Sequence, residues 1–566
     1  MPEPRCNVAD RLTALAAART ESIAVVEANR GGYRTITFRE LERDATLLAR
    51  GLVAMGVKPG DRIALLVRPG LEFVTLVFAL LRSGATLVLV DAGLGRQNIL
   101  RCLAMTEPQG FVAIPLAHAL RIASRKFPYA KLNVTVGRRW FWGGETLDSL
   151  RKIGERANAE LPHTSADDHA AIVFTSGSTG PPKGVLYRHE TFATQADEIQ
   201  RQYGIEPGGI DLACFPLFGL FNVSMGVTTV LPEMDFSRPA AADPKKLLRA
   251  ANDWKVTQAF ASPAVWRNLS THCERTGERI PTLQNVFSCG APVPAKVIRR
   301  TLACVHPKAK LHTPYGATEA LPVATIEAQE ILTETAAKTD QGAGVCVGRK
   351  FDSIEWRVIR IRDDAIATMD EAEELPTGEI GELIVRGPQV SRTYLGDFNK
   401  AAKIIDGETV WHRVGDVGYF DDQQRFWYCG RKSQRVRHGN GDLFTEKVEN
   451  VFADIPGVNR VALVGVPVNN LQRPALIFEL APSSSASNEE EVWELCRSIN
   501  PNIENVWYGQ HEIKGQESFT DWPYLLIHPK LPTDIRHNSK IQREKLAVWA
   551  EKQLAKRKTR SAARRG

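Results

Sequence analysis

A short polar stretch near residue 180 carries the clearest chemical signal in the chain. It reads Phe174-Thr-Ser-Gly-Ser-Thr-Gly-Pro-Pro-Lys-Gly-Val185 and combines four hydroxyl side chains, three glycines and one lysine. Small residues let backbone N–H groups approach an anion closely, hydroxyls add donors, and a lysine adds positive charge. The stretch therefore predicts a loop that holds a polyphosphate, with these residues as its contacts: Thr175, Ser176, Gly177, Ser178, Thr179, Gly180 and Lys183.

The order of residues distinguishes this stretch from the common nucleotide-binding loop. In the pattern G-x-x-x-x-G-K-[ST] a glycine precedes the lysine and a hydroxyl follows it, whereas Pro182 precedes Lys183 here and Gly184 follows it. A cluster of Ser, Thr, Gly and Pro can also be an ordinary surface loop. The ordered string resembles the phosphate-binding signature of the acyl-adenylate-forming superfamily, which includes acyl-CoA ligases, luciferases and nonribosomal peptide adenylation domains.

Three further loops follow strands that we expect at residues 258–261, 285–288 and 310–312. Ligand sites in open parallel sheets gather at the carboxyl ends of the strands, so these loops predict a nucleotide-binding edge. Two of them resemble superfamily motifs, an adenine-binding loop and a Y-G-x-T-E sequence, and the residues concerned are Gly290, Ala291, Pro292 and Tyr315-Gly316-Ala-Thr-Glu319.

The resemblance also implies roles for single residues. Tyr315 would stack on adenine, Thr318 would bind the α-phosphate of ATP, and Glu319 would hold Mg²⁺, a cation that prefers oxygen ligands. Asp416 and Arg431 resemble the family's ribose-binding pair, although a lone Gly-Asp is more often a turn.

The catalytic lysine is expected near the carboxyl terminus. Many superfamily members carry P-x-T-x-x-G-K-[IV] there, and Asn538-Ser-Lys-Ile541 matches this pattern with Ser539 in place of glycine. A lone basic residue in such a loop is usually a solvated charge. With the other motifs present, the resemblance implies that Lys540 enters the site of the first half-reaction, and we expect the catalytic residues to be Lys540, Thr318 and Glu319.

The implied chemistry is attack of a carboxylate on the α-phosphate of ATP, with Mg²⁺ as the second cofactor. Positioning and charge neutralisation by the protein assist this step. No protein nucleophile is needed, and no Ser/His/Asp arrangement is evident.

A closer resemblance covers nearly the whole chain. It is to the β-lactone synthetases of bacterial long-chain olefin biosynthesis, and it is carried by residues 173–189, 312–319, 411–431 and 534–549. It implies adenylation of a branched 3-hydroxy fatty acid, a 2-alkyl-3-hydroxy acid, whose own hydroxyl then displaces AMP and closes a four-membered ring. The alternatives are a long-chain fatty acyl-CoA ligase and an idle nucleotide-binding module. The base that takes the hydroxyl proton stays open, with His189 and His312 as candidates by proximity to motifs.

The same resemblance divides the chain into an amino-terminal AMP-binding domain (residues 1–430), a hinge (431–436), a carboxy-terminal domain (437–552) and a basic tail (553–566). Family hinges usually read Gly-Arg-x-Lys-Asp, whereas Gln434 stands in place of the aspartate here. This departure is compatible with a reaction that consumes no CoA.

The expected fold class is α/β. Apolar periodicity predicts a helix up to Met55, a strand over 61–67, a helix over 71–82 and a strand over 85–90, the alternation of a parallel sheet with crossover helices. From Gly378 the chain becomes β-rich. We expect a large amino-terminal domain of parallel-sheet α/β subdomains plus a β-barrel-like subdomain, then a small mobile α+β carboxy-terminal domain. The apolar segment 211–221 predicts core that borders the acyl pocket, where Gly219 would leave room for a bulky substrate.

Composition restricts the class of protein. The chain has 566 residues, 43% hydrophobic and 24% charged, which is typical of globular proteins with several domains. Nine cysteines without a C-x-x-C pair indicate neither a zinc site nor a disulfide framework, and favour a reducing, cytoplasmic location. No run is apolar enough to span a membrane and no secretory signal begins the chain.

Charge gives no indication of nucleic acid binding. The net charge is +7, but the last eleven residues contribute six positive charges and no acid. A solvated tail is the simplest interpretation, and contact with anionic lipid or a partner protein is the alternative. We expect a small-molecule substrate, and the sequence leaves assembly with other pathway enzymes open.

Overall fold

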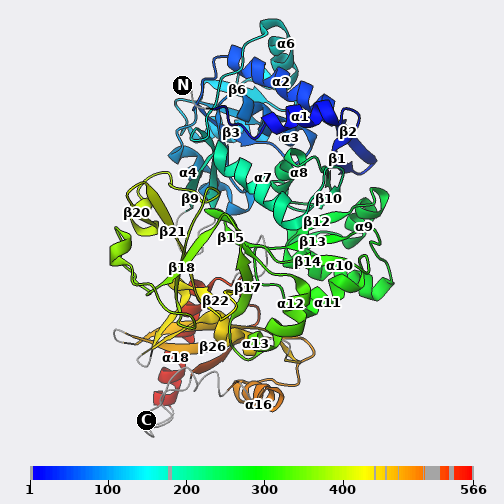
Figure 1. Cartoon of the computed structure of the whole chain (residues 1–566). Helices are drawn as coiled ribbons and strands as arrows, with labels where there is room; N and C mark the ends of the chain where they lie inside the picture. Colours follow the sequence, from blue (N-terminus) through cyan, green and yellow to red (C-terminus); the bar gives the residue numbers. More distant parts are fainter. Residues whose placement is uncertain are drawn as a thin grey trace. The chain divides into compact units, whose positions relative to one another are not determined.

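The computed structural model describes residues 4–175, 182–438, 441–452, 455–468, 471–500, 503, 523–533 and 541–563. The chain forms two compact units (Figure 1). Unit 1 comprises Met1–Ala324, Phe351–Glu355 and Val385–His412. Unit 2 comprises Thr325–Lys350, Trp356–Ile384 and Arg413–Gly566.

Unit 1 contains two seven-stranded sheets. In the first, neighbouring strands are parallel except for the β1–β2 hairpin at one edge, and the order is β14 (Lys310–His312), β13 (Asn285–Ser288), β12 (Gln258–Ala261), β10 (Ile210–Ala213), β11 (Thr228–Leu231), β1 (Ile23–Asn29) and β2 (Gly32–Thr37).

The second sheet of unit 1 repeats this plan. Its strands are parallel except for the β8–β9 hairpin, and the order is β7 (Glu145–Thr146), β6 (Leu132–Thr135), β5 (Gly110–Ala113), β3 (Arg62–Leu66), β4 (Thr86–Leu89), β8 (His169–Thr175) and β9 (Lys183–Arg188). The residues between Thr175 and Pro182, which hold most of the predicted phosphate loop, lie outside the described residues.

Helices connect and cover these sheets, and α9, α10 and α11 lie beside β12, β13 and β14 (Figure 1). The helices of unit 1 are α1 (Asp10–Ala18), α2 (Phe38–Ala54), α3 (Leu71–Arg82), α4 (Arg96–Met105), α5 (Pro115–Ser124), α6 (Leu147–Ala157), α7 (His189–Tyr203), α8 (Phe218–Ser224), α9 (Pro244–Asp253), α10 (Pro263–Thr276), α11 (Ala295–Ala303) and α14 (Asn399–Ala402).

Local sequence accounts for the start of α2. The hydroxyl of Thr37 accepts a hydrogen bond from the Glu40 backbone N–H at 3.2 Å, and the Glu40 carboxylate accepts one from the Thr37 N–H at 2.8 Å. This capping box satisfies two backbone donors that the first turn leaves free. The apolar stripe of α2, which includes Leu41, Leu48 and Leu52, is then fully buried against α3 and α6.

Three short strands complete unit 1. They are β15 (Tyr315–Ala317), which pairs antiparallel with β16 (Ala320–Thr325), and β20 (Lys403–Asp406), which pairs with the start of β21 (Thr409–Phe420). The turn between β15 and β16 holds Thr318 and Glu319, so the predicted Y-G-x-T-E motif forms a hairpin.

Unit 2 is built mainly of antiparallel strands and is β-rich from residue 378 as the sequence predicts. One group follows the order β17 (Val345–Lys350), β22 (Phe426–Arg431), β21, β19 (Gly381–Arg386) and β18 (Glu355–Ile359), and a pair is formed by β23 (Val436–His438) and β24 (Gly441–Leu443). Short helices α12 (Ala328–Glu330) and α13 (Ala336–Asp340) precede β17.

The end of unit 2 is an α+β layer. Strands β25 (Val458–Val468) and β26 (Leu471–Leu480) are antiparallel, β27 (Tyr524–Ile527) pairs parallel with β26, and the helices are α15 (Thr445–Glu449), α16 (Glu489–Ile499) and α18 (Arg543–Ala563). Leu546 and Ala550 of α18 pack against β25. None of the helices in the described ranges is long and apolar enough to cross a bilayer.

Candidate active site

Glu319, the predicted magnesium ligand, is held by contacts from two other segments of unit 1. The hydroxyl of Tyr394 donates to Glu319 Oε1 at 2.8 Å, and the backbone N–H of Ser391 donates to the Glu319 carbonyl at 2.8 Å. The hydroxyl of Tyr187, on β9, donates to the carbonyl of Thr318. The turn that presents Thr318 and Glu319 is therefore fixed at its backbone and at one carboxylate oxygen.

Tyr394 also contacts two ammonium groups. The Nζ of Lys183 lies 5.6 Å from the centroid of the Tyr394 ring and 5.4 Å from that of Phe398, and the Nζ of Lys403 lies 5.2 Å from the Tyr394 ring. An ammonium over an aromatic face is attracted by the ring quadrupole. We call Lys183, Glu319, Tyr394 and Lys403 the Tyr394 cluster. It joins the described end of the phosphate loop to the predicted magnesium ligand.

Lys403 is a buried lysine. Its side chain is only 3% exposed, and its Nζ donates to the carbonyl of Ser391. Burial lowers the pKa of Lys403 to about 7, and the carboxylate of Glu319 opposes part of that shift. Near neutral pH the amine of Lys403 can thus be either protonated or neutral.

The Tyr394 cluster fits Mg²⁺ as a partner of a polyphosphate. Among the described residues no group of three or more His, Cys, Asp or Glu side chains could hold a metal ion. Mg²⁺ commonly binds one or two carboxylates and takes its other ligands from substrate phosphates and water. Oε2 of Glu319, which forms no hydrogen bond with the described residues, satisfies that requirement.

The two predicted adenine-side loops depend on glycine. Gly290 has φ +97°, in the left-handed region. A Cβ on Gly316 would lie 2.6 Å from the backbone oxygen of Ala320, which is too close for any side chain. Ala291 and Tyr315 are half-buried, and Pro292 is exposed. Contact of these residues with adenine stays a prediction.

In unit 2 the predicted ribose-binding pair is brought together. Asp416 on β21 and Arg431 on β22 are directly opposite in the antiparallel ladder, and Arg431 Nη1 lies 3.0 Å from Asp416 Oδ1. The same nitrogen donates to the carbonyl of Val414 at 3.0 Å. Asp416 is 4% exposed, so its carboxylate is largely shielded from solvent beside the arginine.

Gln434, the residue that departs from the family hinge, has a specific partner. Its Oε1 accepts a hydrogen bond from Arg543 at 3.1 Å, and Arg543 also pairs with Glu449 at 2.7 Å. Arg543 lies three residues after Lys540 in the sequence, so the segment that follows the predicted catalytic lysine is tied to residue 434. Lys540 itself lies outside the described residues, as do Ser176, Gly177, Ser178, Thr179 and Gly180, and no side-chain contact is described for Thr175.

Unit 1 also contains a largely apolar pocket that is partly open to solvent. It lies between α7, α8 and one face of the first sheet. Side chains two residues apart on a strand share a face of the sheet. This explains why Gln258 and Phe260 of β12 both line the pocket, as do Phe287 of β13 and Cys289 just after it. Aromatic and apolar side chains form most of the wall, namely Ile199, Tyr203, Ile205, Phe218, Phe221, Met225, Phe260, Phe287, Cys289, Pro314, Leu321 and Pro322.

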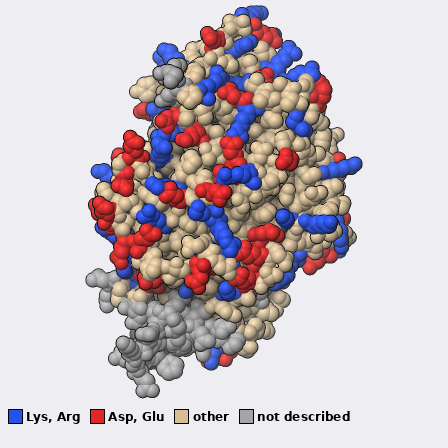
Figure 2. All heavy atoms as spheres, in the orientation of Figure 1, with Lys and Arg blue, Asp and Glu red and all other residues tan. Residues whose placement is uncertain are grey.

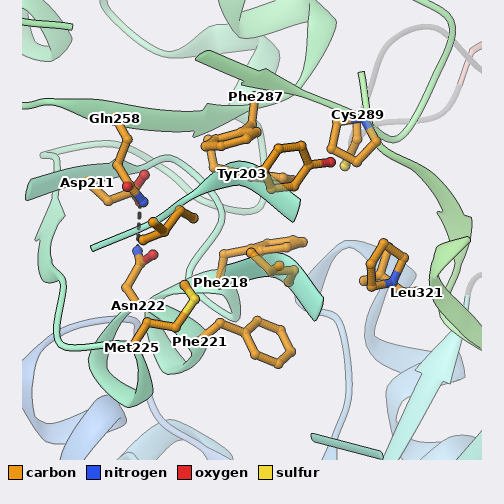
Figure 3. Close-up of a pocket in the computed structure, with 15 residues that line it drawn as sticks. Tyr203, Asp211, Phe218, Phe221, Asn222, Met225, Gln258, Phe287, Cys289 and Leu321 are labelled. Carbon is orange, nitrogen blue, oxygen red and sulfur yellow. Dashed lines mark hydrogen bonds between the residues drawn. The ribbon is translucent and has the colours of Figure 1, made fainter. Parts of the chain in front are cut away.

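The pocket has two unlike ends. Figure 3 shows Cys289 and Leu321 at one end, and Asp211, Asn222 and Gln258 at the other. Cys289 directly precedes Gly290, and Pro314 directly precedes Tyr315, so the first end adjoins both predicted adenine-side loops. We call Asp211, Asn222 and Gln258 the polar floor.

The polar floor is internally satisfied. Asn222 Nδ2 donates to Asp211 Oδ2 at 2.8 Å, and the side chain of Gln258 also hydrogen-bonds Asp211. Asp211 is 1% exposed, and burial raises its pKa to about 7. Asp211 and Gln258 are register partners on β10 and β12, and Gln258 is opposite Asn285 on β13. Cys289 lies four residues beyond Asn285, so at about 3.3 Å per residue the pocket is roughly 13 Å deep.

The sequence-based interpretation of Gly219 is wrong. A Cβ on Gly219 would lie 3.0 Å from a methyl group of Thr229 on β11, and Gly219 does not line the pocket. The glycine allows α8 to pack closely on the sheet, and it leaves no room for a substrate. Its neighbours Phe218 and Phe221 provide the wall, so the segment does border the pocket as expected.

Of the two histidines named as candidate bases, His189 is buried inside unit 1 and His312 is half-buried. His189 is fully buried, and burial lowers the pKa of His189 to about 4. Burial also lowers the pKa of His312 to about 4, and its ring packs against Tyr203 and Phe287, behind the pocket wall. Both rings are therefore neutral near pH 7, and neither lines the pocket.

Sequence reasoning missed Tyr394, Lys403 and the polar floor. Tyr394 belongs to no motif quoted above, and Lys403 stands in the polar run Asn399-Lys-Ala-Ala-Lys403, which reads as a solvated helix. Asp211 stands in a strand that is otherwise apolar. A charged residue inside an apolar run was the one available signal, and it was present only for Asp211.

Comparison with known proteins gives the following matches. A family model described as AMP-binding enzyme matches residues 12–395. An olefin beta-lactone synthetase of Stenotrophomonas maltophilia is 44% identical over 98% of this chain and 99% of its own length. A second, of Xanthomonas campestris, is 42% identical over 97% of this chain and 98% of its own.

Solved structures show the same fold. An amide bond synthetase of Marinactinospora thermotolerans has a TM-score of 0.74 at 21% identity, over 96% of this chain and 99% of its own. ATP-bound MatB of Rhodopseudomonas palustris has a TM-score of 0.74 at 20% identity, over 97% of this chain and 99% of its own.

Proposed function

The chain belongs to the AMP-binding enzyme family and is an ATP-dependent acyl-adenylate-forming ligase, and from this premise we propose that it converts a long-chain 2-alkyl-3-hydroxy acid to a β-lactone. The observation that carries the lactone product is the 44% identity, over nearly the full length of both chains, to a relative named olefin beta-lactone synthetase. A long-chain fatty acyl-CoA ligase is the alternative, because it would share every residue of the first half-reaction.

In the first half-reaction an oxygen of the substrate carboxylate bonds to the α-phosphorus of ATP, and the bond to the β-phosphate oxygen breaks. Pyrophosphate leaves and the acyl-adenylate remains. We assign the residues at 175–180 and Lys183 to the leaving pyrophosphate, and Lys540 and Thr318 to the reacting carboxylate and α-phosphate. Their work is positioning and neutralisation of the charge that develops.

The nucleoside and the metal complete this assignment. We assign Tyr315 and the loop of Gly290, Ala291 and Pro292 to adenine, and Asp416 with Arg431 to ribose. Glu319 would hold Mg²⁺, which when bound supplies positive charge to the phosphate oxygens. Gly316 serves the hairpin that carries Thr318 and Glu319.

In the second half-reaction the substrate's own 3-hydroxyl oxygen bonds to the acyl carbon. The bond from that carbon to AMP breaks, the hydroxyl loses its proton, and AMP leaves with the electron pair. The ring is strained, and the mixed anhydride supplies the driving force. Because nucleophile and acyl carbon belong to one molecule, the enzyme has to hold the hydroxyl near the carbon and to allow its proton to pass to an acceptor, such as water.

The pocket supports a long alkyl arm as part of the substrate. Its depth of roughly 13 Å matches about ten carbon–carbon bonds in an extended chain, since bonds of ~1.5 Å advance about 1.3 Å each along the zigzag. Each buried methylene contributes about 0.8 kcal/mol, so a full arm supplies much of the binding energy. A 2-alkyl acid has two arms, and we assign one of them to this pocket.

The test is a product assay with a synthetic 2-alkyl-3-hydroxy acid, ATP and Mg²⁺, with and without CoA, analysed by mass spectrometry. We expect β-lactone, AMP and pyrophosphate in equal amounts without CoA. The 2-alkyl acid that lacks the 3-hydroxyl is the matched control substrate, and it should give adenylate and pyrophosphate but no lactone. A thioester product that forms only with CoA would establish the acyl-CoA ligase instead.

A further inference from the structure

A segment of unit 1 that takes no part in the proposed reaction has an unusual charge pattern. Residues 108–144 contain six lysines and arginines and no aspartate or glutamate. On the face shown in Figure 2, by contrast, basic and acidic side chains are interspersed. The six are Arg121, Arg125, Lys126, Lys131, Arg138 and Arg139, and none of them forms an ion pair with a residue that the structure describes.

The same segment exposes large apolar side chains. Nine large hydrophobic residues in the described ranges are exposed, and five of them lie here, namely Leu116 (66%), Ile122 (39%), Tyr129 (59%), Trp140 (58%) and Phe141 (80%). Isolated exposed hydrophobic residues need no explanation. Five within 26 residues of the sequence, in a segment that has basic but no acidic side chains, are a concentration that does need one.

The patch is held in place by a buried tryptophan. Trp142 donates from Nε1 to the Thr135 hydroxyl at 3.0 Å, and its ring stacks on His118 of α5 at 5.7 Å. The rings of Trp140 and Phe141 lie 5.2 Å and 5.5 Å from Trp142. The loop after β6 is therefore fixed against α5, with Trp140 and Phe141 directed outward. Arg121 is half-buried, with its guanidinium over the ring of Phe111. We call the five exposed apolar residues and the other five basic residues, which are exposed, the aromatic-basic patch.

We propose that the aromatic-basic patch docks unit 1 on the surface of an anionic lipid bilayer. Tryptophan and tyrosine favour the headgroup region, phenylalanine, leucine and isoleucine favour the acyl boundary below it, and lysine and arginine are attracted by anionic headgroups. Nucleic acid would use the positive charge but offers no counterpart for the leucine and isoleucine. The proposal rests on the patch alone and stands whichever acid is the substrate.

Both parts of the patch are needed for the interaction. Apolar insertion by a few side chains is weak and reversible, and basic residues near an anionic surface each add a similar contribution that salt screens. We therefore expect binding that requires anionic lipid, decreases with salt and is lost when either part is removed.

The test is sedimentation of the full chain with vesicles of phosphatidylethanolamine and phosphatidylglycerol, and with vesicles of phosphatidylcholine alone. Wild type should bind the anionic vesicles, and about tenfold less well in high salt or with neutral lipid. The Trp140→Ser/Phe141→Ser variant and the Arg138→Glu/Arg139→Glu variant should each bind about tenfold less well. Pyrophosphate release with a short, soluble acid should be unchanged in both.

Matched controls separate the patch from general surface effects. Ile405→Ser removes an exposed apolar side chain of the same unit (55% exposed), and Arg238→Glu/Arg275→Glu reverses two exposed charges outside the patch. Both controls should bind like wild type. The proposal is wrong if wild type does not bind anionic vesicles, or if the patch variants bind them as wild type does, which would assign the binding to the basic tail. It is also wrong if the control variants lose binding to the same extent, or if single-stranded DNA displaces the protein completely from the vesicles.

Discussion

The Tyr394 cluster and the polar floor of the pocket both contain a buried ionisable group with a pKa of about 7, but they reach it from opposite directions. In the Tyr394 cluster, burial lowers the pKa of Lys403, a base. In the polar floor, burial raises the pKa of Asp211, an acid. The physical cause is the same, because burial penalises whichever form is charged.

The surroundings of the two groups differ. Lys403 lies with a second ammonium, an aromatic ring and a carboxylate, as a site for phosphates and a cation requires. Asp211 lies with two amides inside an apolar wall and meets no cation in the described contacts. The Tyr394 cluster thus brings several charged groups together, whereas the pocket surrounds a single carboxyl group whose neutral form is favoured by burial. The four predictions below test that contrast.

The largest effect is expected at the carboxylate of the Tyr394 cluster. Glu319→Gln keeps the size of the side chain but removes its charge, so the rate of pyrophosphate release should decrease by roughly hundredfold or more. The measurement is pyrophosphate release across a Mg²⁺ titration. Glu233→Gln, which removes a carboxylate paired with Lys246 at 2.7 Å, is the matched control and should retain the wild-type rate. An equal loss in both variants would contradict the assignment of Glu319.

A smaller effect is expected at the hydroxyl that orients this carboxylate. Tyr394→Phe removes the 2.8 Å hydrogen bond to Glu319 and retains the ring under both ammonium groups. The Mg²⁺ concentration for half-maximal rate should rise roughly tenfold, as when a group that orients a metal ligand is lost. The rate at saturating Mg²⁺ should largely recover.

Tyr33→Phe provides the matched control for that variant, because it removes a tyrosine-to-carboxylate hydrogen bond of 2.6 Å to Asp253 elsewhere in unit 1. Its Mg²⁺ dependence should equal that of wild type. If Tyr394→Phe lowers the rate equally at all Mg²⁺ concentrations, Tyr394 does not position the metal ligand.

The contrast between the two regions also explains what could be predicted from the sequence. Binding of a nucleotide imposes fixed residue types at fixed spacings, so the sequence predicts Lys183, Glu319 and the Asp416–Arg431 pair as site residues. The structure brings the last two together. The strands at 258–261, 285–288 and 310–312 were also correct, because short apolar runs before glycine or proline turns indicate buried parallel strands.

The pocket could not be predicted in the same way. The proposed function of this pocket, binding of an alkyl arm, needs only an apolar shape, which many sequences provide. The side chains that form its wall are separated by up to 123 residues, from Ile199 to Pro322. Gly219 was misread because a missing side chain can be filled by a neighbour, here Thr229. Lys403 was missed because its burial depends on packing against segments far along the chain.

At the pocket the expected effect is on substrate choice. Phe218 stacks on Phe260 at 3.7 Å, and both rings line the wall. Phe218→Ala should lower kcat/KM for an acid with a ten-carbon arm roughly tenfold. This agrees with the loss of one to a few kcal/mol of binding energy that is typical when an apolar pocket loses contact with its substrate. With an arm of two or three carbons the value should change little. Phe141→Ala, an aromatic truncation at an exposed site, is the control, and equal losses for both arm lengths would argue against binding of the arm here.

The smallest effect is expected in the pH dependence of stability, where the two regions should act in opposite directions. Asp211 binds more protons in the folded state than in the unfolded state between pH 3.8 and about 7, so its contribution to stability falls as pH rises through that window. Lys403 binds fewer protons in the folded state between about pH 7 and 10.5, so its contribution rises through that window. Between pH 6 and pH 8 the contribution of each group to the free energy of unfolding changes by about 1 kcal/mol, and the two changes nearly cancel in the wild type.

Each single variant should therefore reveal the group that remains. Between pH 6 and pH 8, without Mg²⁺, the free energy of unfolding of Asp211→Asn should rise by about 1 kcal/mol relative to wild type. That of Lys403→Met should fall by about the same amount. Thermal unfolding would detect this as opposite shifts of roughly 1 °C in Tm. Lys403→Met also leaves the carbonyl of Ser391 without its hydrogen-bond donor, which lowers stability at every pH. Such a loss of stability, because it is independent of pH, cancels when the two pH values are compared. Shifts of the same sign in both variants would contradict the opposite charges of the two buried groups, and with them the contrast between a site for charge and a pocket for hydrocarbon.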